Sequence, residues 1–305
     1  KVTEEEMIIQ NLKQATVELQ IKPVPRIYLD PLPESIDLLD AINESASQLV
    51  FAQGIWNAEK KGGDAVIASL GYYDSPSDCL QEVLNIDFNQ QDGHLWLIGA
   101  PGSDKESVLV SMVLSLALTH TPEEVQFYIL DFGAGSLRAL DALPHVGSVI
   151  RLQDKERIQR LITFLDAEMD ARNTHETMSE LGLKQRSNLF VIVNNYAEMR
   201  VNFPDEADHL SRYIRDGKTA GIHFLISTNR GAELNRNIAS NIARKLVLQL
   251  ASKDEYLDVI GRNVPLLSAR STGRGYWVDE RPYECQIGNT GQIEVKKLGQ
   301  EMSST

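Results

Sequence analysis

The sequence feature that most constrains the fold is a six-residue loop, 99–104, placed between an apolar run and a helical pattern. Leu95 to Ile98 is apolar and predicts a short buried strand, and apolar residues at helical spacing begin just after Lys105. A buried strand, a loop of small residues and a helix form the layout of the phosphate-binding P-loop, G-x-x-x-x-G-K-[ST]. This layout is a unit of α/β folds, so the loop predicts a sheet with helices packed against it.

The P-loop template is only half met. The candidate phosphate-binding residues, in order, are Gly99, Ala100, Pro101, Gly102, Ser103, Asp104, Lys105, Glu106 and Ser107. Gly99 and Lys105 match the template, whereas Asp104 stands in place of the second glycine. Glu106 replaces the serine or threonine whose hydroxyl binds Mg²⁺ in this template. Ser107 lies about 100° further round the helix and is a poor substitute.

The aspartate at position 104 opposes phosphate binding in two ways. The glycine of a working P-loop lets backbone N–H groups close on phosphate oxygens, and a side chain there intrudes. Two unit charges ~4 Å apart also repel by about 1 kcal/mol in water and ~4 kcal/mol at an effective dielectric constant near 20. In a purely structural role, Asp104 and Glu106 are favoured by the helix dipole, and Lys105 turns toward Asp104 or another acid as a counter-ion. We predict a folded loop without functional nucleotide binding.

The second half of such a site is an acidic pair at the end of an apolar strand, where it holds Mg²⁺ and activates water. Two strands compete for this role in the sequence. One is 127–131, which ends in Asp131, and the other is 189–193, which is followed by Asn194 and Asn195. An amide side chain binds metal weakly and cannot take a proton near neutral pH. If the second strand is the catalytic one, the machinery for hydrolysis is missing.

Alternating strand and helix patterns extend over the central part of the chain. Strands are predicted at 95–98, 125–130, 189–193, 222–227 and 245–250, and helices at 105–119, 154–172 and 205–216. Two short strand-like runs follow, at 275–278 and 283–287. Strands and helices that alternate at this spacing predict an α/β fold with a mostly parallel sheet flanked by helices.

The N-terminal part carries different signals. Thr3 and Glu6 form a capping box that opens an amphipathic helix through about Leu19. Four prolines then fall between residues 23 and 33, which favours an extended arm. The arm either packs on the domain through the Ile-Tyr-Leu segment 27–29 or is a mobile linker, and the residues leave both readings open.

These signals divide the chain into four predicted segments. They are a linker helix and Pro-rich arm at 1–45, small accessory strands at 46–92, the P-loop domain at 93–290, and a tail or linker to a next module at 291–305. The accessory strands are expected at 65–73 and 80–88, with a turn between them. Because the first residue is lysine rather than methionine, we expect a piece of a longer protein.

The balance of charge limits the partners of this chain. With 30 Lys and Arg against 43 Asp and Glu, the formal charge is −13, which opposes binding to nucleic acid and to anionic lipid. Two distant cysteines, Cys79 and Cys285, favour a reducing compartment over a disulfide framework. No apolar run approaches the roughly 18 residues that span a bilayer. No cluster of His, Cys and Asp has the spacing of metal ligands, so no metal site is predicted.

Several longer motifs surround the loop. They are Gly93-His94, Gly99-Ala-Pro-Gly-Ser103, Leu118-Thr-His-Thr-Pro-Glu-Glu-Val-Gln-Phe-Tyr-Ile-Leu-Asp-Phe-Gly-Ala-Gly-Ser-Leu137, Leu143-Pro-His-Val-Gly147, Gly221-Ile-His-Phe-Leu-Ile-Ser-Thr-Asn-Arg230 and Gly273-Arg-Gly275. Through them, most of 70–280 resembles the FtsK/SpoIIIE-type P-loop ATPase modules of type VII secretion translocases, the EccC/EssC proteins. The pattern is most similar to the second module of their tandem array. The arm segment Leu29-Asp-Pro-Leu-Pro33 also resembles the segment that precedes their later modules.

The resemblance implies a RecA-like P-loop NTPase fold and assigns the acidic pair to Asn194 and Asn195. It also implies glycine at 104 and Ser or Thr at 106 in a working site, so the chain departs from the family pattern at four positions. We therefore expect a regulatory or scaffolding module that is catalytically inactive, with ATP and Mg²⁺ as cofactors only if the site functions.

The implied partners are neighbouring ATPase modules of the same chain, small helical WXG-type secretion substrates and other secretion-system membrane proteins. The resemblance further implies ring formation by the full-length protein, and no partner among nucleic acids. The implied location is the cytoplasmic face, as the soluble part of a membrane-anchored protein.

Two arginines are candidates for contacts beyond the loop. Arg230, after the strand at 222–227, is a candidate phosphate sensor or one half of a loop salt bridge. Arg274, between two glycines, is a candidate contact with a neighbouring module or part of a tight turn. Three further side chains are predicted to be structural, namely His145, His223 and Trp96, whereas Trp56 is a candidate partner anchor.

Three other functions compete with an inactive module. A working ATPase would use Lys105, Glu106 and Asp131 as unorthodox ligands. A DNA motor is opposed by the charge of −13. A dinucleotide-binding fold would place Gly99 and Gly102 in the turn and Asp131 on a ribose, but G-x-G-x-x-G is absent and Asp131 lies about thirty residues on rather than ~20.

Overall fold

The computed structural model describes residues 3–19, 29–45, 51–52, 55–56, 65–89, 93–175, 187–217, 219–267, 272–291 and 293–304. The helices are α1 (Glu4–Glu18), α2 (Leu38–Glu44), α3 (Lys105–Thr119), α4 (Lys155–His175), α5 (Tyr196–Asn202), α6 (Pro204–Asp216), α7 (Arg236–Ala239), α8 (Lys253–Ile260) and α9 (Val295–Ser303), with the 3₁₀-helices η1 (Ser136–Ala142) and η3 (Gly231–Glu233). The strands are β1 (Phe51–Ala52), β2 (Ile55–Trp56), β3 (Ile67–Ser75), β4 (Leu80–Asp87), β5 (Leu95–Ile98), β6 (Val125–Asp131), β7 (Val146–Arg151), β8 (Asn188–Asn194), β9 (Ile222–Thr228), β10 (Lys245–Val247), β11 (Arg274–Val278) and β12 (Pro282–Ile287).

Ten of these strands form one sheet, in the order β4-β3-β12-β11-β10-β5-β9-β8-β6-β7. The strands from β10 to β7 run parallel to one another. The strands β11, β12, β3 and β4 extend the sheet beyond β10 in antiparallel fashion. The predicted α/β fold with a mostly parallel sheet is therefore confirmed. Because the carboxyl ends of parallel strands meet at one edge, the loops after β5, β6, β8 and β9 are brought together there.

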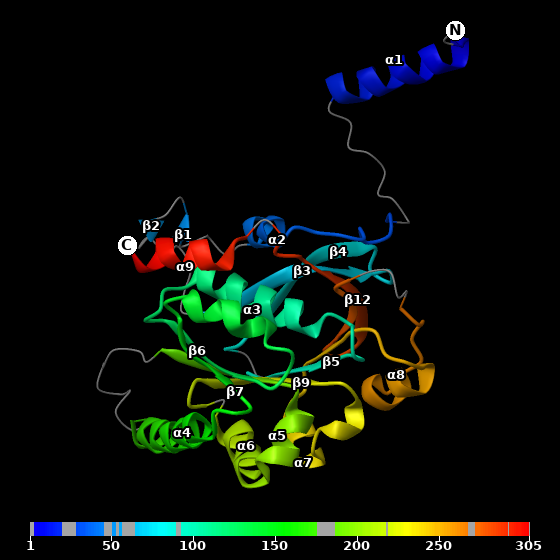
Figure 1. Ribbon diagram of the computed structural model, residues 1–305. Coiled ribbons are helices and arrows are strands. Elements are labelled where there is room, and N and C mark those ends of the chain that lie inside the picture. The colour runs from blue at the N-terminus through cyan, green and yellow to red at the C-terminus, as the bar shows by residue number, and fades with distance from the viewer. Residues whose placement is uncertain are drawn as a thin grey trace.

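Helices cover both faces of the sheet (Figure 1). One hydrophobic cluster joins α2, α3, η1 and α9 to one face, and a second joins α4, α5, α6, α7 and α8 to the other. No helix within the described ranges is long and apolar enough to cross a lipid bilayer. The sheet is thus enclosed between two helical layers, and its carboxyl edge is left for loops.

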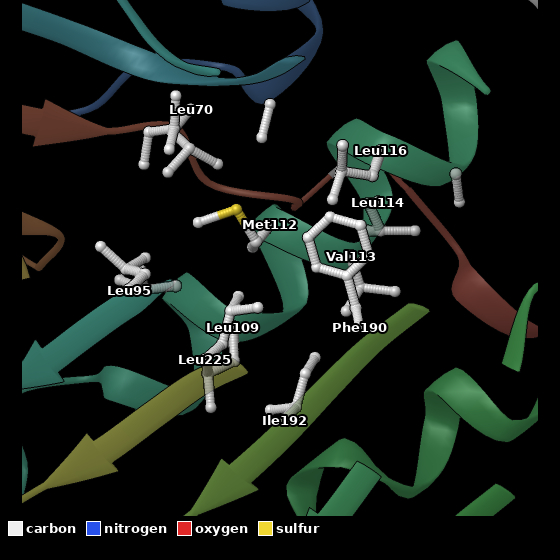
Figure 2. Close-up of a cluster of buried hydrophobic side chains, with 14 of the residues drawn as sticks. Leu70, Leu95, Leu109, Met112, Val113, Leu114, Leu116, Phe190, Ile192 and Leu225 are labelled. Carbon is white, nitrogen blue, oxygen red and sulfur yellow. The ribbon is translucent and has the colours of Figure 1, made fainter. Parts of the chain in front are cut away.

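Helix α3 is the most deeply buried helix of the first layer. Figure 2 shows Leu109, Met112 and Val113 of this helix facing Leu70 of β3 and Phe190 of β8. These five side chains are at most 1% exposed. The wide apolar stripe expected for 105–119 is confirmed, because Leu114 and Leu118 on its other sides are buried as well. Each such side chain contributes roughly 1.5–3 kcal/mol when fully buried.

The structure corrects several predicted boundaries. Strand β7 was missed because Gly147 and Ser148 interrupt its apolar pattern. Strand β10 ends at Val247 rather than at 250, although the next N–H, of Leu248, still donates to Ile98 O at 2.7 Å. Strands β3 and β4, expected as accessory strands that lead into the core, join the main sheet through the pairing of β3 with β12. Helix α8 was also missed.

The segment expected to be a tail, 291–305, contains helix α9 and packs on the domain. Met302 is 2% exposed and belongs to the same hydrophobic cluster as α3. A Cβ at Gly299 would overlap the carbonyl of Ala142 at the end of η1, so α9 lies directly against that helix. Helix α9 therefore belongs to the same helical layer as α3 and η1.

The N-terminal predictions are confirmed in part. Thr3 N–H donates to Glu6 Oε2 at 2.9 Å and Glu6 N–H to Thr3 Oγ1 at 3.3 Å, which is the predicted capping box of α1. In the arm, Leu32 and Ile36 are 5% and 6% exposed, so this part of the arm lies on the domain. Leu29 is 39% exposed, and the other two residues of 27–29 lie outside the described residues.

Gly71 marks the irregularity in the β3–β4 pair. The register shifts between Ser69 and Tyr72, and Gly71 has a φ of +154°, where a Cβ would overlap the backbone oxygen of Gln286 in β12. We expect Gly71→Ala to lower the free energy of unfolding by about 3 kcal/mol, because β12 must shift to admit the methyl group.

The control for this prediction is Gly261→Ala at the end of α8. Its φ is +74° and no heavy atom lies within 4 Å of the Cβ position, so the cost is the left-handed backbone alone, about 1–2 kcal/mol. Urea unfolding of both variants measures the difference. Equal losses would contradict the packing argument at Gly71.

Candidate functional site

The loop between β5 and α3 is tied to the strands on either side of β5. Gly99 N–H donates to Thr228 O, at the end of β9, at 3.2 Å. Ala100 N–H donates to Gln249 O, just beyond β10, at 2.8 Å. Ser103 N–H donates to Ala100 O at 3.0 Å and closes a turn. The loop therefore has a defined backbone without any ligand.

Asp104 keeps the backbone conformation that favours glycine. Its φ is 67° and its ψ 32°, in the left-handed region, where a residue with a Cβ is strained. Its side chain makes no capping bond to the backbone of α3. Instead its Oδ1 accepts a hydrogen bond from Ser107 Oγ at 2.6 Å. Asp104 thus lies at the N-terminus of α3, where the helix dipole favours a carboxylate, and Ser107 rather than the helix backbone binds its side chain.

Lys105 is turned inward. It is 5% exposed, and its Nζ donates to Gly99 O at 2.6 Å, to Ala100 O at 3.2 Å and to Asn229 Oδ1 at 3.1 Å. Lys105 was expected to turn toward Asp104 or another acid; its amine bonds these three acceptors rather than Asp104, and Glu106 and Glu233 are the acids that act on its charge. Burial lowers the pKa of Lys105, and the carboxylates of Glu106 and Glu233 partly oppose that shift.

Asn229 is a site residue that the sequence analysis did not single out. Asn229 follows β9 directly. Its N–H donates to Glu233 Oε2 at 2.7 Å, and its own Oδ1 accepts the hydrogen bond from Lys105 Nζ. A polar amide placed just after a buried strand was the available signal. Its partner lies 124 residues away in sequence, so only the fold joins the two.

The two strands that competed for the acidic pair are neighbours in the sheet. Asp131, the last residue of β6, is paired in register with Asn194, the last residue of β8. Asn194 Nδ2 donates to Asp131 Oδ1 at 2.9 Å, and its Oδ1 accepts from Ser227 Oγ at 2.8 Å. Asp131 also accepts from the N–H groups of Gly133 at 3.2 Å and Leu137 at 3.3 Å. Both side chains are 2% exposed or less and are engaged within the protein.

Asn195 is the second residue at the pair position. It has a left-handed backbone with φ 62°, and its N–H donates to Ser227 Oγ at 2.8 Å. Its Nδ2 donates to Phe132 O at 3.4 Å, and its Oδ1 is buried with no hydrogen-bond partner among the described residues. These hydrogen bonds hold Asn195 at the carboxyl edge of the sheet, beside Asn194, in spite of its strained backbone.

Glu106 reaches across from α3 to the ends of β6 and β8. A methyl group built on Gly133 would lie 3.2 Å from Glu106 Oε1, 2.5 Å from Asn194 Nδ2 and 3.4 Å from Asp131 Oδ1. The loop, Glu106 and the two strand ends therefore converge on one place. Within the described part of the chain, no three His, Cys, Asp or Glu side chains are arranged to hold a metal ion.

The two candidate arginines make contacts inside the chain. Arg230 is 71% exposed in its side chain and lies 3.8 Å from Glu255 Oε1, as in the salt-bridge alternative. Arg274 donates through its guanidinium to Leu32 O at 2.8 Å and pairs with Glu284 Oε1 at 3.4 Å. Within its own chain, this side chain therefore holds the arm, and the contact of Arg274 with a neighbouring module stays a prediction.

The remaining candidates are structural, as predicted. His145 Nε2 is hydrogen-bonded to His120 O at 2.8 Å, and His223 Nδ1 to Gly93 O at 2.8 Å. Trp96 is 4% exposed and donates to Thr228 Oγ1. The side chain of Trp56, the candidate partner anchor, lies outside the described part of the chain.

The topology excludes the dinucleotide-binding alternative. In that fold the strand that carries the glycine turn lies beside the strand that follows it along the chain. Here β5 lies between β9 and β10, and β9 and β8 separate it from β6. Asp131 consequently lies three strands away from the loop strand, bonded to Asn194.

This arrangement defines a P-loop ATPase fold, and solved structures of that class match it. ATPases 2 and 3 of EccC from Thermomonospora curvata, solved with a signal sequence peptide, match 90% of this chain and 51% of that chain, with a TM-score of 0.70 and 26% identity. The cytoplasmic domain of the same organism's type VII secretion ATPase EccC matches 92% of this chain and 35% of that chain, with a TM-score of 0.74 and 26% identity.

Sequence comparison gives a family model that matches part of the chain, and named relatives. The FtsK/SpoIIIE family model matches residues 68–188. The ESX secretion system protein EccC of Thermomonospora curvata is 32% identical over 79% of this chain and 19% of that protein. EccCb1 of the Mycobacterium tuberculosis ESX-1 system is 29% identical over 65% of this chain and 36% of that protein. The chain therefore carries a region that matches the FtsK/SpoIIIE family and has EccC and EssC proteins as relatives, and it spans well under half the length of either of the two relatives named above.

The inward position of Lys105 predicts a stability effect in the absence of nucleotide. Lys105→Met removes the donor for three acceptors, so we expect the free energy of unfolding to fall by about 2 kcal/mol. Lys253→Met, at an exposed position of α8, is the matched control and is expected to change stability by less than about 0.5 kcal/mol. If Lys105→Met left the urea midpoint unchanged or raised it, the lysine would not stabilise the loop.

Two buried histidines predict acid sensitivity. Burial lowers the pKa of His145 to about 4 and that of His223 to about 3, against about 6.5 in the unfolded chain. The unfolded chain therefore binds more protons below about pH 6.5. Stability is fully present above that pH and falls as the pH drops toward 4, by up to about 1.4 kcal/mol per pH unit for each histidine.

Urea unfolding at pH 7 and pH 5 measures this loss. His223→Gln is expected to remove one histidine's share of the slope. His209→Gln, at an exposed position of α6, is the control for the substitution itself. A slope that does not respond to His223→Gln would contradict the assignment.

Proposed function

We propose that the chain is an ATPase-like module of a type VII secretion motor whose nucleotide site no longer hydrolyses ATP. Its phosphate loop acts as part of the folded core, and the module serves as a regulatory or scaffolding element that binds partners. We further propose that it is the second module of a tandem series, on the cytoplasmic face of a membrane-anchored protein.

The end of β8 is the observation that carries this proposal. The residues at the acidic-pair position are amides, and both polar atoms of Asn194 are engaged by Asp131 and Ser227. An amide cannot accept a proton from an attacking water near neutral pH. Asp131 does not replace it, because Asn194 and two backbone N–H groups already occupy its oxygens.

The loop itself is a poor fit for magnesium triphosphate. Asp104 keeps the glycine-like backbone but adds a carboxylate at the N-terminus of α3, and Glu106 adds a second. Lys105, which in a P-loop reaches the β- and γ-phosphates, is instead bonded to loop carbonyls and Asn229. Phosphate would therefore have to displace these bonds while it is repelled by two carboxylates.

Partner binding is the role that remains for such a module. The Thermomonospora curvata structure of ATPases 2 and 3 was solved with a signal sequence peptide, and those modules share this fold. We propose by analogy that this module contacts neighbouring ATPase modules and the small helical WXG-type proteins that the motor exports. Ring formation by the full-length protein would bring copies of the module together.

One observation favours a second candidate, a working ATPase with unorthodox ligands. Glu106 Oε1 and Asp131 Oδ1 both lie within 3.4 Å of the same point beside Gly133, at the edge where a metal would be required. In that case the unmodified chain turns over ATP, and Lys105→Ala abolishes the turnover. The two candidates therefore differ in one direct measurement.

Calorimetry with millimolar Mg-ATP tests the proposal. The unmodified chain is expected to give no binding heat and no phosphate release. The loop reversion Asp104→Gly with Glu106→Thr removes repulsion of about 1–4 kcal/mol, so we expect binding at least tenfold tighter. Adding Asn194→Asp and Asn195→Glu is then expected to give measurable hydrolysis.

The single reversion Asn194→Asp is the matched control, because it restores a carboxylate without repairing the loop. It is expected to leave nucleotide binding unmeasurable. A micromolar dissociation constant for the unmodified chain would contradict the proposal, and a turnover lost in Lys105→Ala would establish the working ATPase.

A further inference from the structure

The arm that precedes α2 is held on the domain by the last strands of the sheet. Arg274 of β11 donates to Leu32 O at 2.8 Å and to Pro33 O at 3.1 Å. Gln81 of β4 donates through Nε2 to Asp30 O at 2.7 Å. These bonds fix the path of residues 29–33 across the antiparallel end of the sheet.

The next part of the arm pairs with the segment after β12. Asn289 N–H donates to Ile36 O at 2.8 Å, and Asn289 O accepts from Leu38 N–H at 3.0 Å. Asn289 Nδ2 also donates to Ser35 Oγ at 2.7 Å. Asn289 therefore forms a parallel β-bridge with Asp37 of the arm.

The residue before it binds the helix that carries the phosphate loop. Gly288 O accepts from Ser111 Oγ of α3 at 2.9 Å, and Ser111 is 1% exposed. A Cβ at Gly288 would lie 2.7 Å from Leu38 Cα, so only glycine lets the arm approach this closely. The Gly288–Asn289 peptide thus has α3 on one side and the arm on the other.

We propose that the Gly288–Asn289 peptide couples the arm to α3, so that release of the arm loosens the start of α3 and the phosphate loop. This inference goes beyond the proposed function and does not depend on whether nucleotide binds. Whatever holds the chain upstream of Leu29 acts on the arm and, through this peptide, on the loop.

The path along α3 from the contact with Gly288 to the phosphate loop is short. Ser111 lies six residues from Lys105, about 9 Å along the helix axis. Because every residue of α3 from Ser111 to Thr119 is buried, this part of the helix has no room to absorb a shift by bending. The loop ends at the N-terminus of this helix, so a shift of α3 reaches it directly.

Amide hydrogen exchange of the full 305-residue chain tests the coupling without nucleotide. Arg274→Ala removes the charged donor for two arm carbonyls, and Leu32→Ala removes the buried anchor from the arm side. Both are expected to raise exchange in 29–45 about tenfold. We expect a rise of several fold in 103–112 as well. Arg281→Ala, at an exposed position between β11 and β12, is the control and changes neither segment.

Ser111→Ala then tests the route. Combined with Arg274→Ala, it should leave the arm open but reduce the effect on 103–112 to less than half. Ser115→Ala is the matched control, because its hydroxyl bonds Ser69 of β3 rather than the arm segment, and it should leave the transmitted effect unchanged.

Two results would overturn the proposal. One is an arm that opens in both Arg274→Ala and Leu32→Ala while exchange in 103–112 stays at the wild-type rate. The other is a transmitted effect that Ser111→Ala does not reduce, which would assign the coupling to the packing of α2 on α3.

Discussion

The burial of α3 between the sheet and a second layer of elements is the constraint on which the rest of the structure depends. Leu109, Met112 and Leu116 of this helix are 0–1% exposed, and strands from opposite ends of the sheet contribute to their surroundings. A helix enclosed in this way cannot be displaced without opening the core, because interiors are close-packed. The loop at its N-terminus therefore keeps its shape for reasons of packing, whether or not it binds phosphate.

Because packing determines the shape of the loop, its residues do not have to bind phosphate for the loop to fold. Asp104 tolerates a left-handed backbone because the strands and α3 fix both ends of the loop, and Ser107 satisfies its carboxylate. Lys105 donates to the loop's own carbonyls. Asn194 bridges β6 and β9 through its amide, which a carboxylate could not do, because a carboxylate has no N–H to give to Asp131. The replacements at this site thus form a consistent set of internal hydrogen bonds.

The sequence predicted what depends on local pattern. Helix 105–119 and strand 95–98 were found with their correct bounds, because an unbroken apolar pattern specifies both. Strand β7 was missed because Gly147 and Ser148 lack that pattern. The partners of Lys105 and Arg274 could not be predicted, since Asn229 lies 124 residues from one and Leu32 lies 242 residues from the other. The departures from the P-loop template were visible in the sequence, but the hydrogen bonds that these residues make could be found only from the fold.

The pairing of β3 with β12 has a consequence for how the chain is made. Tyr72 and Gln286, which face each other in this pair, are separated by more than two hundred residues. Folding rates fall when contacts join distant parts of a chain, because a long loop must close before the contact can form. During synthesis, β3 and β4 leave the ribosome long before β12 exists, and the edge of β3 that pairs with β12 stays open until then. The domain is completed only when its last strands are made, so a shortened chain that ends before β12 leaves an open apolar sheet edge.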